Sequence, residues 1–410
     1  MTRQHPTQLL VLNCGSSSLK YDLFGPWASD ARPVRIASGS IEGVGGSAAR
    51  LRHDPLLTGH RGPAREVVAT DHESALHIVL DLLREEWSDL DGLAAVAHRV
   101  VHGGPDLARP VSLDDDAIAA IDRASALAPL HNPPALAGIR AVETLWPGLP
   151  QVAVFDTAFH ATLPAAASTY ALPRDLARRH HVRRWGFHGI SHQYVVSRTA
   201  DALGIPADEV CLISCHIGNG VSVTAVREGR SIDTSMGFTP LDGAVMGTRS
   251  GSIDPGVLFH LGRAGMSPDE LEDLLQNRSG MLGLCGDSDM RRVRERADAG
   301  DGEARFALEV YTHRLRCLVA SYLGQLPGLH ALVFTAGVGE HDPALRAEVV
   351  DPLAHLGFEL DTAANEAAVG GEHPARIDSG RGVAIWVVPT DEGTQVAREA
   401  HSALFGPVAE

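Results

Sequence analysis

The sequence of 410 residues is long enough for two domains, each with a hydrophobic core of its own. A formal net charge of −16 and an isoelectric point near 5.7 argue against nucleic acid or an anionic membrane as a partner. The five cysteines form no CxxC pair and no zinc-ligand spacing, and no apolar run approaches the ~18 residues of a membrane span. Residues 9–12 are too short for the apolar region of a signal peptide, so we expect a cytoplasmic protein with reduced thiols.

The first predicted element is a hairpin at residues 9–24, in which two short strands flank the polar turn NCGSSS at residues 13–18. Such a turn offers backbone N–H groups and hydroxyls to an anion. Lys20 follows the turn and is the only lysine of the chain, which uses arginine everywhere else. A compact ammonium that contacts one phosphate oxygen explains this choice, and a solvated strand residue is the alternative. We interpret the hairpin as part of a nucleotide site.

A helix and a strand follow. Thr70 and Glu73 form a capping-box pattern ahead of a helical apolar stripe that runs to residue 87. The apolar segment 93–101 predicts a strand that carries Arg99. An arginine inside an apolar strand requires an anion, which is either a ligand or a structural ion-pair partner.

The next two features place polar side chains beside predicted elements. Residues 128–134 read as a proline-bounded loop that presents His131 and Asn132, where a hydrogen-bonding strut is the alternative to a catalytic histidine. Residues 151–155 predict a buried strand, and Asp156 follows it directly. Ligands of α/β sheets bind at the carboxyl ends of strands, although Asp156 could instead cap the next segment.

The second half repeats the opening pattern. Residues 183–192 place Phe187 and His188 between two glycines, ahead of a helix that we expect Ser191 to cap and Gly204 to close. Residues 210–226 then form a second strand, glycine-rich turn and strand, in which the turn lies 203 positions after the first. This spacing predicts an internal duplication in which both hairpin turns face one polyphosphate.

The remaining segments are a long polar stretch and several elements. Residues 233–255 are polar, rich in glycine and include Arg249, and long irregular segments of this kind are usually functional. We expect helices at residues 268–277, from residue 287, at 308–322, after Pro343 and up to residue 403, and strands at 331–335 and 383–388. The turn AGVGE at residues 336–340, between a strand and a helix, suits the adenosine end of a nucleotide.

With these motifs in order, the chain resembles the acetate kinase family of the actin-like ATPase superfamily. The resemblance rests on ten collinear stretches: VLNCGSSSLKYDLF, HRVVHGG, PLHNPP, FDTAFH, WGFHGISH, SCHIGNG, TSMGFTPLDG, GTRSGSIDPG, FTAGVGEHD and PTDEG. It implies an α/β fold of two duplicated actin-like ATPase (ribonuclease H-like) domains with a central cleft. The implied first domain comprises residues 1–157 and 390–410, and the second, residues 158–389, carries the nucleotide site.

The implied activity is reversible transfer of a phosphoryl group from ATP to acetate, giving acetyl phosphate and ADP, with Mg²⁺ or Mn²⁺, in a homodimer. The implied catalytic residues are Arg99, Asp156, His188 and Arg249, and Arg99 also binds the carboxylate. The implied walls of the acyl pocket are Val101, Leu130, Phe187 and Pro240, and the implied metal residues are Asn13 and Glu392. The implied nucleotide residues are Asn13, Ser18, Lys20, His216, Gly218, Asn219, Gly220, Asp289, Met290, Arg291, Gly337, Val338, Gly339, Glu340 and His341.

The chain departs from the family pattern at four positions. Ser252 stands where the family usually has Asp, and Gly393 follows Glu392 where a second acidic residue is common, so two possible metal-shell carboxylates are missing. Met290 and His341 stand near the nucleotide where Phe and Asn are usual. A propionate or other short-chain carboxylate kinase is an alternative within the class, because one methylene changes binding by only ~1–3 kcal/mol. A catalytically silent nucleotide-binding module and a plain ATP or polyphosphate hydrolase are the alternatives outside it.

Overall fold

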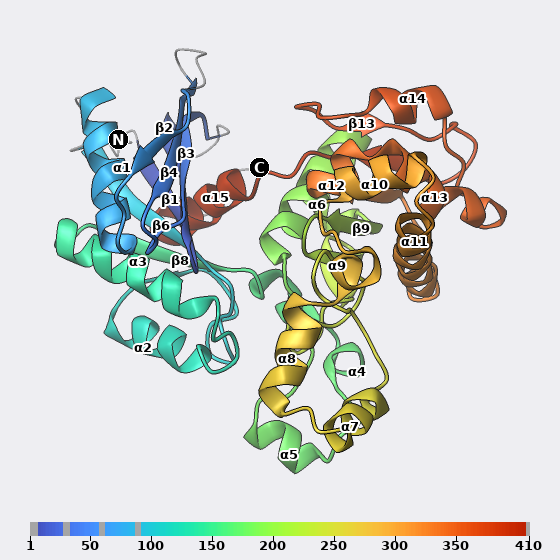
Figure 1. Cartoon of the computed structure of the whole chain (residues 1–410). Coiled ribbons are helices and arrows are strands. Elements are labelled where there is room, and N and C mark those ends of the chain that lie inside the picture. The colour runs from blue at the N-terminus through green and yellow to red at the C-terminus, as the bar shows by residue number, and fades with distance from the viewer. Residues whose placement is uncertain (1–6, 28–32, 57–61, 87–91, 407–410) are drawn as a thin grey trace. The chain divides into compact units, whose positions relative to one another are not determined.

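The computed structural model describes residues 7–27, 33–56, 62–86 and 92–406. The chain divides into two compact units, Met1–Ala158 with Asp391–Glu410, and Phe159–Thr390 (Figure 1). Each unit is built on its own mixed β-sheet. In the described part of the chain, no helix is long and apolar enough to cross a membrane.

The first unit contains an eight-stranded sheet in the order β5-β4-β3-β2-β1-β6-β8-β7. Its strands are β1 (Thr7–Gly15), β2 (Ser18–Trp27), β3 (Arg35–Glu42), β4 (Ala49–Pro55), β5 (Arg65–Val67), β6 (Leu93–Val100), β7 (Val111–Ser112) and β8 (Gln151–Phe155). Its helices are α1 (His72–Glu86), α2 (Asp115–Ala124), α3 (Asn132–Leu145) and α15 (Glu392–Phe405). Helices α1 and α3 lie on one side of this sheet, and α15 lies on the other (Figure 1).

The second unit contains a six-stranded sheet in the order β11-β10-β9-β12-β14-β13. Its strands are β9 (Leu212–Ile217), β10 (Val221–Arg227), β11 (Arg230–Thr234), β12 (Ala331–Thr335), β13 (Ala375–Arg376) and β14 (Ala384–Val387). Its helices are α4 (Ala165–Ser168), α5 (Arg174–Arg179), α6 (Gly189–Leu203), α7 (Pro255–Arg263), α8 (Pro268–Asn277), α9 (Gly280–Cys285), α10 (Met290–Asp298), α11 (Gly302–Leu323), α12 (Ala336–His341), α13 (Pro343–Val350) and α14 (Thr362–Ala367).

The two sheets share one strand plan. In β3-β2-β1-β6-β8, three antiparallel strands are followed by two parallel additions. The order β11-β10-β9-β12-β14 repeats this plan with the same strand directions. The duplication predicted from the two hairpins is therefore present in the backbone.

Apolar side chains fix each unit separately. In the first, the inward side chains of β1 and β2 pack against α1, as Leu10, Leu19, Leu76 and Val79 share one buried cluster. In the second, Val195 and Val196 of α6 pack against β9 and β12. These cores hold the strand ends, and hence the polar residues that follow them, in place.

Four local predictions are wrong. Helix α1 is capped by the Asp71 carboxylate, which accepts from Ser74 N at 2.7 Å, and not by Thr70. Helix α6 begins two residues before Ser191, with His188 at its N-cap, although Gly204 closes it as predicted at φ 68°. The proline-bounded loop already becomes α3 at Asn132, because proline fits the first helical turn. The turn at residues 336–340 is itself helical, as α12.

Candidate active site

In the first unit, two carboxylates hold Arg99. The β6–β8 pairing sets Arg99 opposite Val154, and Asp156 follows the end of β8. Arg99 Nε and Nη2 donate to Asp156 Oδ1 and Oδ2 at 3.0 and 2.7 Å, and Arg99 Nη1 lies 3.2 Å from Glu392 Oε2. The bidentate pair fixes the plane of the guanidinium. Among the described residues, three of the five N–H groups of Arg99 meet these carboxylates, which leaves two for a ligand.

Burial and charge set the protonation of this cluster. Burial alone would lower the pKa of Arg99, but Asp156 and Glu392 outweigh it and raise the pKa, so the guanidinium stays charged. Burial raises the pKa of Glu392, an effect that Arg99 and Lys20 oppose and Asp156 reinforces. One guanidinium faces two carboxylates, so the cluster is short of positive charge.

The first hairpin places its polar residues near this cluster. Asn13 pairs with Lys20 across β1 and β2, and Gly15 pairs with Ser18, so the turn itself is only Ser16 and Ser17. Lys20 is exposed, and its charge opposes the rise that burial causes in the pKa of Glu392.

The other predicted residues of this unit have different environments. Val101 follows β6 and is half-buried, whereas Leu130 is 56% exposed. His131 is the N-cap residue of α3. Asn132 is fully buried and bonds the backbone of His102 in both directions, at 3.1 and 2.9 Å, so it ties α3 to the segment after β6. Asn132 is thus a structural strut.

In the second unit, His188 is held in an unusual backbone conformation. It lies at φ 56° and ψ 23°, a left-handed conformation that is strained for a residue with a Cβ. Its Nδ1 lies 3.0 Å from Ser222 Oγ on β10. Its ring stacks on His216 with centroids 4.1 Å apart and planes at 22°. The preceding Phe187 is 2% exposed and anchors the segment.

Arg249 meets His188 at Gly220. A Cβ on Gly220 would lie 3.3 Å from His188 Nε2 and 3.6 Å from Arg249 Nη1, so glycine preserves the space where the two groups converge. Arg249 Nη1 donates to the Pro240 carbonyl oxygen at 3.1 Å. Burial lowers the pKa of Arg249 from its high ordinary value. A guanidinium and an imidazole converging at a glycine turn form an anion site.

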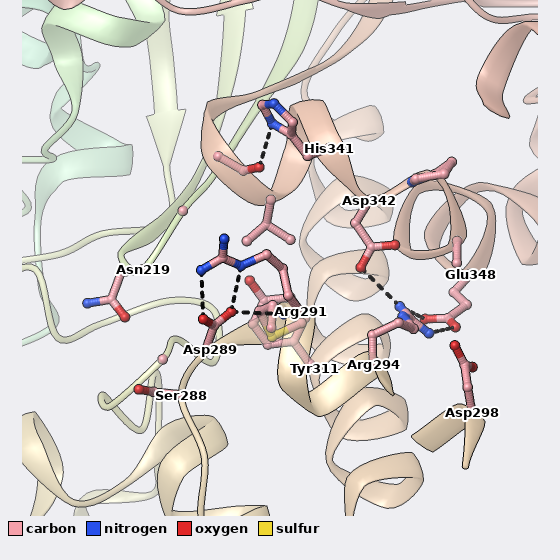
Figure 2. Close-up of a pocket in the computed structure, with 17 residues that line it drawn as sticks. Asn219, Ser288, Asp289, Arg291, Arg294, Asp298, Tyr311, His341, Asp342 and Glu348 are labelled. Carbon is pink, nitrogen blue, oxygen red and sulfur yellow. Dashed lines mark hydrogen bonds and ion pairs between the residues drawn. The ribbon is translucent and has the colours of Figure 1, made fainter. Parts of the chain in front are cut away.

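A cavity of about 1000 Å³ begins at the same turn. Figure 2 shows Asn219 at one side, the Asp289–Arg291 pair in the middle, and Arg294 with its acidic partners beyond. Asp289 caps α10, and its carboxylate accepts from Arg291 Nε and Nη2 at 3.0 and 2.8 Å. The predicted nucleotide residues that line the cavity are Gly218, Asn219, Asp289, Met290, Arg291, Gly337, Val338 and His341.

Four predicted nucleotide residues of this unit are not among those lining the cavity: His216, Gly220, Gly339 and Glu340. The Gly339 carbonyl oxygen accepts from the buried Arg346 Nη1 at 2.8 Å. Glu340 Oε1 accepts from the backbone N–H groups of Ala336 and Thr390, at 2.7 and 3.0 Å. Both residues therefore hold α12 in place beneath the cavity.

Comparison with known proteins gives the family. The model of the acetokinase family matches residues 8–398. The chain belongs to this family. It is 48% identical to the acetate kinase of Streptomyces avermitilis over 98% of each chain, and 50% identical to that of Leifsonia xyli over 97% of this chain and 98% of that one.

Solved structures agree with this family assignment. The acetate kinase of Porphyromonas gingivalis has a TM-score of 0.90 and 37% identity, and covers 97% of this chain and 100% of its own. A propionate kinase from Francisella tularensis has a TM-score of 0.89 and 39% identity, and covers 96% and 98%. The predicted family, the two-domain actin-like α/β fold and the predicted phosphotransferase class are confirmed. Small-molecule substrates, with a phosphoryl donor among them, follow from membership of this kinase family.

The acetokinase fold raises the question of a metal ion. In the described part of the chain, no three His, Cys, Asp or Glu side chains form a preformed metal group. Mg²⁺ is usually held by one or two carboxylates, several waters and the phosphates of a substrate. Asp156 and Glu392, which share one guanidinium and lack a full complement of positive charge, fit such an ion.

Sequence reasoning missed two groups of site residues. The first group is Ser222 and His192, which are hydrogen-bonded to one another behind His188. The signal in the sequence that could have indicated that His192 lies near His188 is their spacing of one helical turn. The second group also lines the cavity and consists of Arg294, Tyr311, Asp342 and Glu348. Arg294 contacts Asp342 at 3.3 Å and Glu348 at 2.5 Å. No local motif marks this second group.

Proposed function

We propose that this protein catalyses reversible transfer of the γ-phosphoryl group of ATP to acetate, giving acetyl phosphate and ADP. The observation that carries the proposal is the meeting of His188 and Arg249 at Gly220, in the same turn whose Gly218 and Asn219 line a nucleotide-sized cavity. A nucleotide bound with its base among the α10 and α12 residues would place its phosphates toward this turn. The γ-phosphoryl group would then meet a guanidinium and an imidazole.

The chemistry needs charge and alignment rather than a base. A short carboxylate is already ionised at neutral pH. One carboxylate oxygen attacks the γ-phosphorus in line, the bond to the bridging oxygen breaks, and ADP leaves with that electron pair. Asp156 is paired with Arg99, so we assign it the positioning of Arg99 for the acyl carboxylate and not proton abstraction.

Mg²⁺ is part of this proposal. Glu392, Asp156 and the Asn13 amide oxygen are the residues that would hold it, with Mn²⁺ as a substitute. When bound, the ion supplies positive charge that offsets the approach of an anion to a polyphosphate.

We also propose a homodimer and a cytoplasmic location, in keeping with the family. The dimer is supported by α5, α7 and α8, which contain no buried residue. These helices and their flanks expose apolar side chains, among them Leu172, Leu176, Val257 and Phe259 at 40–66%. An exposed apolar surface of this kind is typical of a protein interface.

The test is incubation with Mg-ATP, a carboxylate and hydroxylamine, which converts any acyl phosphate to a coloured hydroxamate. We expect metal-dependent product, strongest with acetate among formate, acetate, propionate and butyrate. ATP binding without hydroxamate from any acid would leave a nucleotide-binding module and refute the proposal. ATP hydrolysis that carboxylates do not change would indicate a hydrolase.

A propionate kinase is the second candidate, favoured by the likeness to the Francisella tularensis structure. Both reactions use the same groups and differ in the room left for one methylene. Product strongest with propionate in the same assay would keep the mechanism and change the substrate.

A further inference from the structure

Behind His188 runs a chain of hydrogen bonds that ends in the core of the second unit. His188 Nδ1 lies 3.0 Å from Ser222 Oγ, and the same oxygen lies 2.7 Å from His192 Nε2. His192 Nδ1 in turn lies 2.9 Å from Ser214 Oγ. Ser222, His192 and Ser214 are all fully buried, so bulk solvent does not reach these hydrogen bonds.

The number of available protons determines which group donates in each of these hydrogen bonds. A hydroxyl carries one proton, so Ser222 donates to one imidazole and accepts from the other. Burial, with the neighbouring His160 and His216, holds the pKa of His192 well below its ordinary value, so His192 is neutral and has a single N–H. Two arrangements remain, which differ in whether that proton lies on Nε2 or Nδ1.

Ser214 distinguishes the two arrangements. If His192 carried its proton on Nδ1, it would donate to Ser214, whose own proton would then need another acceptor. Among the described residues, His192 is the one side-chain partner of the Ser214 hydroxyl. Leaving a buried hydroxyl proton unpaired is unfavourable. The proton therefore lies on His192 Nε2, Ser214 donates to Nδ1, and Ser222 is free to donate to His188.

We propose that Ser222 and His192 hold His188 as the neutral tautomer with its proton on Nε2, so that His188 serves the transferring phosphoryl group as a hydrogen-bond donor and not as a positive charge. The inference rests on the proposed function for its phosphoryl group, whereas the tautomer follows from the hydrogen bonds and the burial of His192. Ser222 and His192 are positioning residues, since they act through His188.

The groups that surround His188 also favour its neutral form. Arg249 lies across Gly220 from Nε2, and the His216 ring stacks on His188. A second positive charge beside Arg249 would be repelled. Protonation of Nδ1 would also require Ser222, His192 and Ser214 all to reverse. Both features favour the neutral form of His188.

The test is long-range ¹H–¹⁵N NMR on the full-length protein with ¹⁵N-labelled histidine, in which the pattern of couplings identifies each tautomer and the cation. The His188 signals are assigned by their loss in His188→Gln. We expect the Nε2–H tautomer of His188 from pH 6 to 8. A His188 that is cationic or protonated only on Nδ1 at pH 7 overturns the proposal. The tautomer is observed in the wild-type protein, and His188→Gln serves only to assign the signals.

Three variants test the link to catalysis. In Ser222→Ala, His188 should populate both tautomers, and kcat should fall about tenfold while KM for ATP and acetate changes by less than about twofold. Ser222→Thr keeps the hydroxyl and should restore the single tautomer. Ser231→Ala is the matched control, because it removes an equally buried hydroxyl that bonds His160 Nδ1 at 2.8 Å and neither His188 nor His192.

An unchanged single tautomer in Ser222→Ala would refute the role of Ser222. A wild-type protein that shows the tautomer but forms no acyl phosphate would instead refute the proposed function. The two failures are thus distinguishable.

Discussion

Gly393 should not tolerate a side chain, although alanine is ordinarily better than glycine in a helix. Gly393 is the second residue of α15, and a Cβ there would lie 2.0 Å from Asp22 Oδ2, 3.0 Å from Asp22 Cγ and 3.2 Å from Arg35 Nη2. Asp22 would have to move by more than about 1 Å to restore a normal contact. Its carboxylate, 24% exposed, is held by Arg35 Nε at 2.9 Å, and Arg35 also pairs with Asp391.

We therefore expect Gly393→Ala to lower the free energy of unfolding by about 1–3 kcal/mol, the usual range for overpacking. Without the clash, the substitution would raise it by up to ~1 kcal/mol through helix propensity. Gly302 provides the control, because it begins α11 and a Cβ there would meet nothing within 4 Å. Gly302→Ala should be neutral or stabilising, so the two alanines should differ in sign.

The assay is urea unfolding at pH 7.5 of the wild type, Gly393→Ala, Asp22→Ala and the double variant. In the Asp22→Ala background the carboxylate is absent, so Gly393→Ala should be neutral or stabilising, with a coupling of at least about 1 kcal/mol. A stable Gly393→Ala with no coupling to Asp22 would show that strand β2 relaxes without strain, which would refute the reasoning. The result also concerns the acidic residue that is common in the family at position 393. In this protein the Asp22 carboxylate already occupies the space beside Gly393.

Three further outcomes are expected. Arg249→Ala should lower the rate of acyl phosphate formation by on the order of 10²-fold with little loss of stability, and near-normal turnover would remove it from the mechanism. The buried Tyr311 hydroxyl has no hydrogen-bond partner among the described residues, so Tyr311→Phe should raise the melting temperature of the protein without nucleotide. Because Tyr311 lines the cavity, the same variant should raise KM for ATP. A lower melting temperature would contradict this reasoning. Burial raises the pKa of the Asp22 carboxyl to about 6, an effect that Arg35 opposes and Asp391 reinforces. The folded state therefore binds a proton on Asp22 more tightly than the unfolded chain does, and the free energy of unfolding falls as the pH rises toward and through 6. Relative to the wild type, Asp22→Asn should thus gain on the order of 2–3 kcal/mol between pH 4 and 7.5 in urea unfolding, and a pH-independent difference would contradict the shift.

The elements that the sequence predicted best are those whose pattern is local. Residues 151–155 and 268–277 match β8 and α8 residue for residue. The two hairpins were identified because alternating apolar residues flank a glycine turn, and that pattern needs no knowledge of the rest of the chain. The duplication followed from their spacing alone.

Helix starts were predicted less well, because several side chains near a boundary can serve as a cap. Thr70 and Asp71 are adjacent, and the backbone path chooses the aspartate. The prolines of residues 128–134 are typical of a loop, whereas Pro133 and Pro134 occupy the first turn of α3, where no intrahelical N–H is needed.

The environment of the candidate site depended on long-range contacts. Arg99 carries a clear requirement for an anion, but its partners Asp156 and Glu392 are 57 and 293 positions away, and no local rule selects them. The Tyr311 hydroxyl belongs to a helix whose apolar pattern gave no sign of a cavity. A polar group buried by tertiary packing is invisible to a reading of local periodicity.

The duplicated hairpins show how one backbone plan can supply two different functions. The residue opposite Asn13 across the first hairpin is Lys20, and the residue opposite His216 across the second is Ser222. In the first unit that position presents an exposed ammonium whose charge reaches Glu392. In the second it presents a buried hydroxyl that bonds two imidazoles. The same position in the two hairpins therefore supplies a positive charge in the first unit and a hydroxyl that orients His188 in the second. Burial on β10 excludes an unpaired charge at this position but favours a hydroxyl whose hydrogen bonds are all formed.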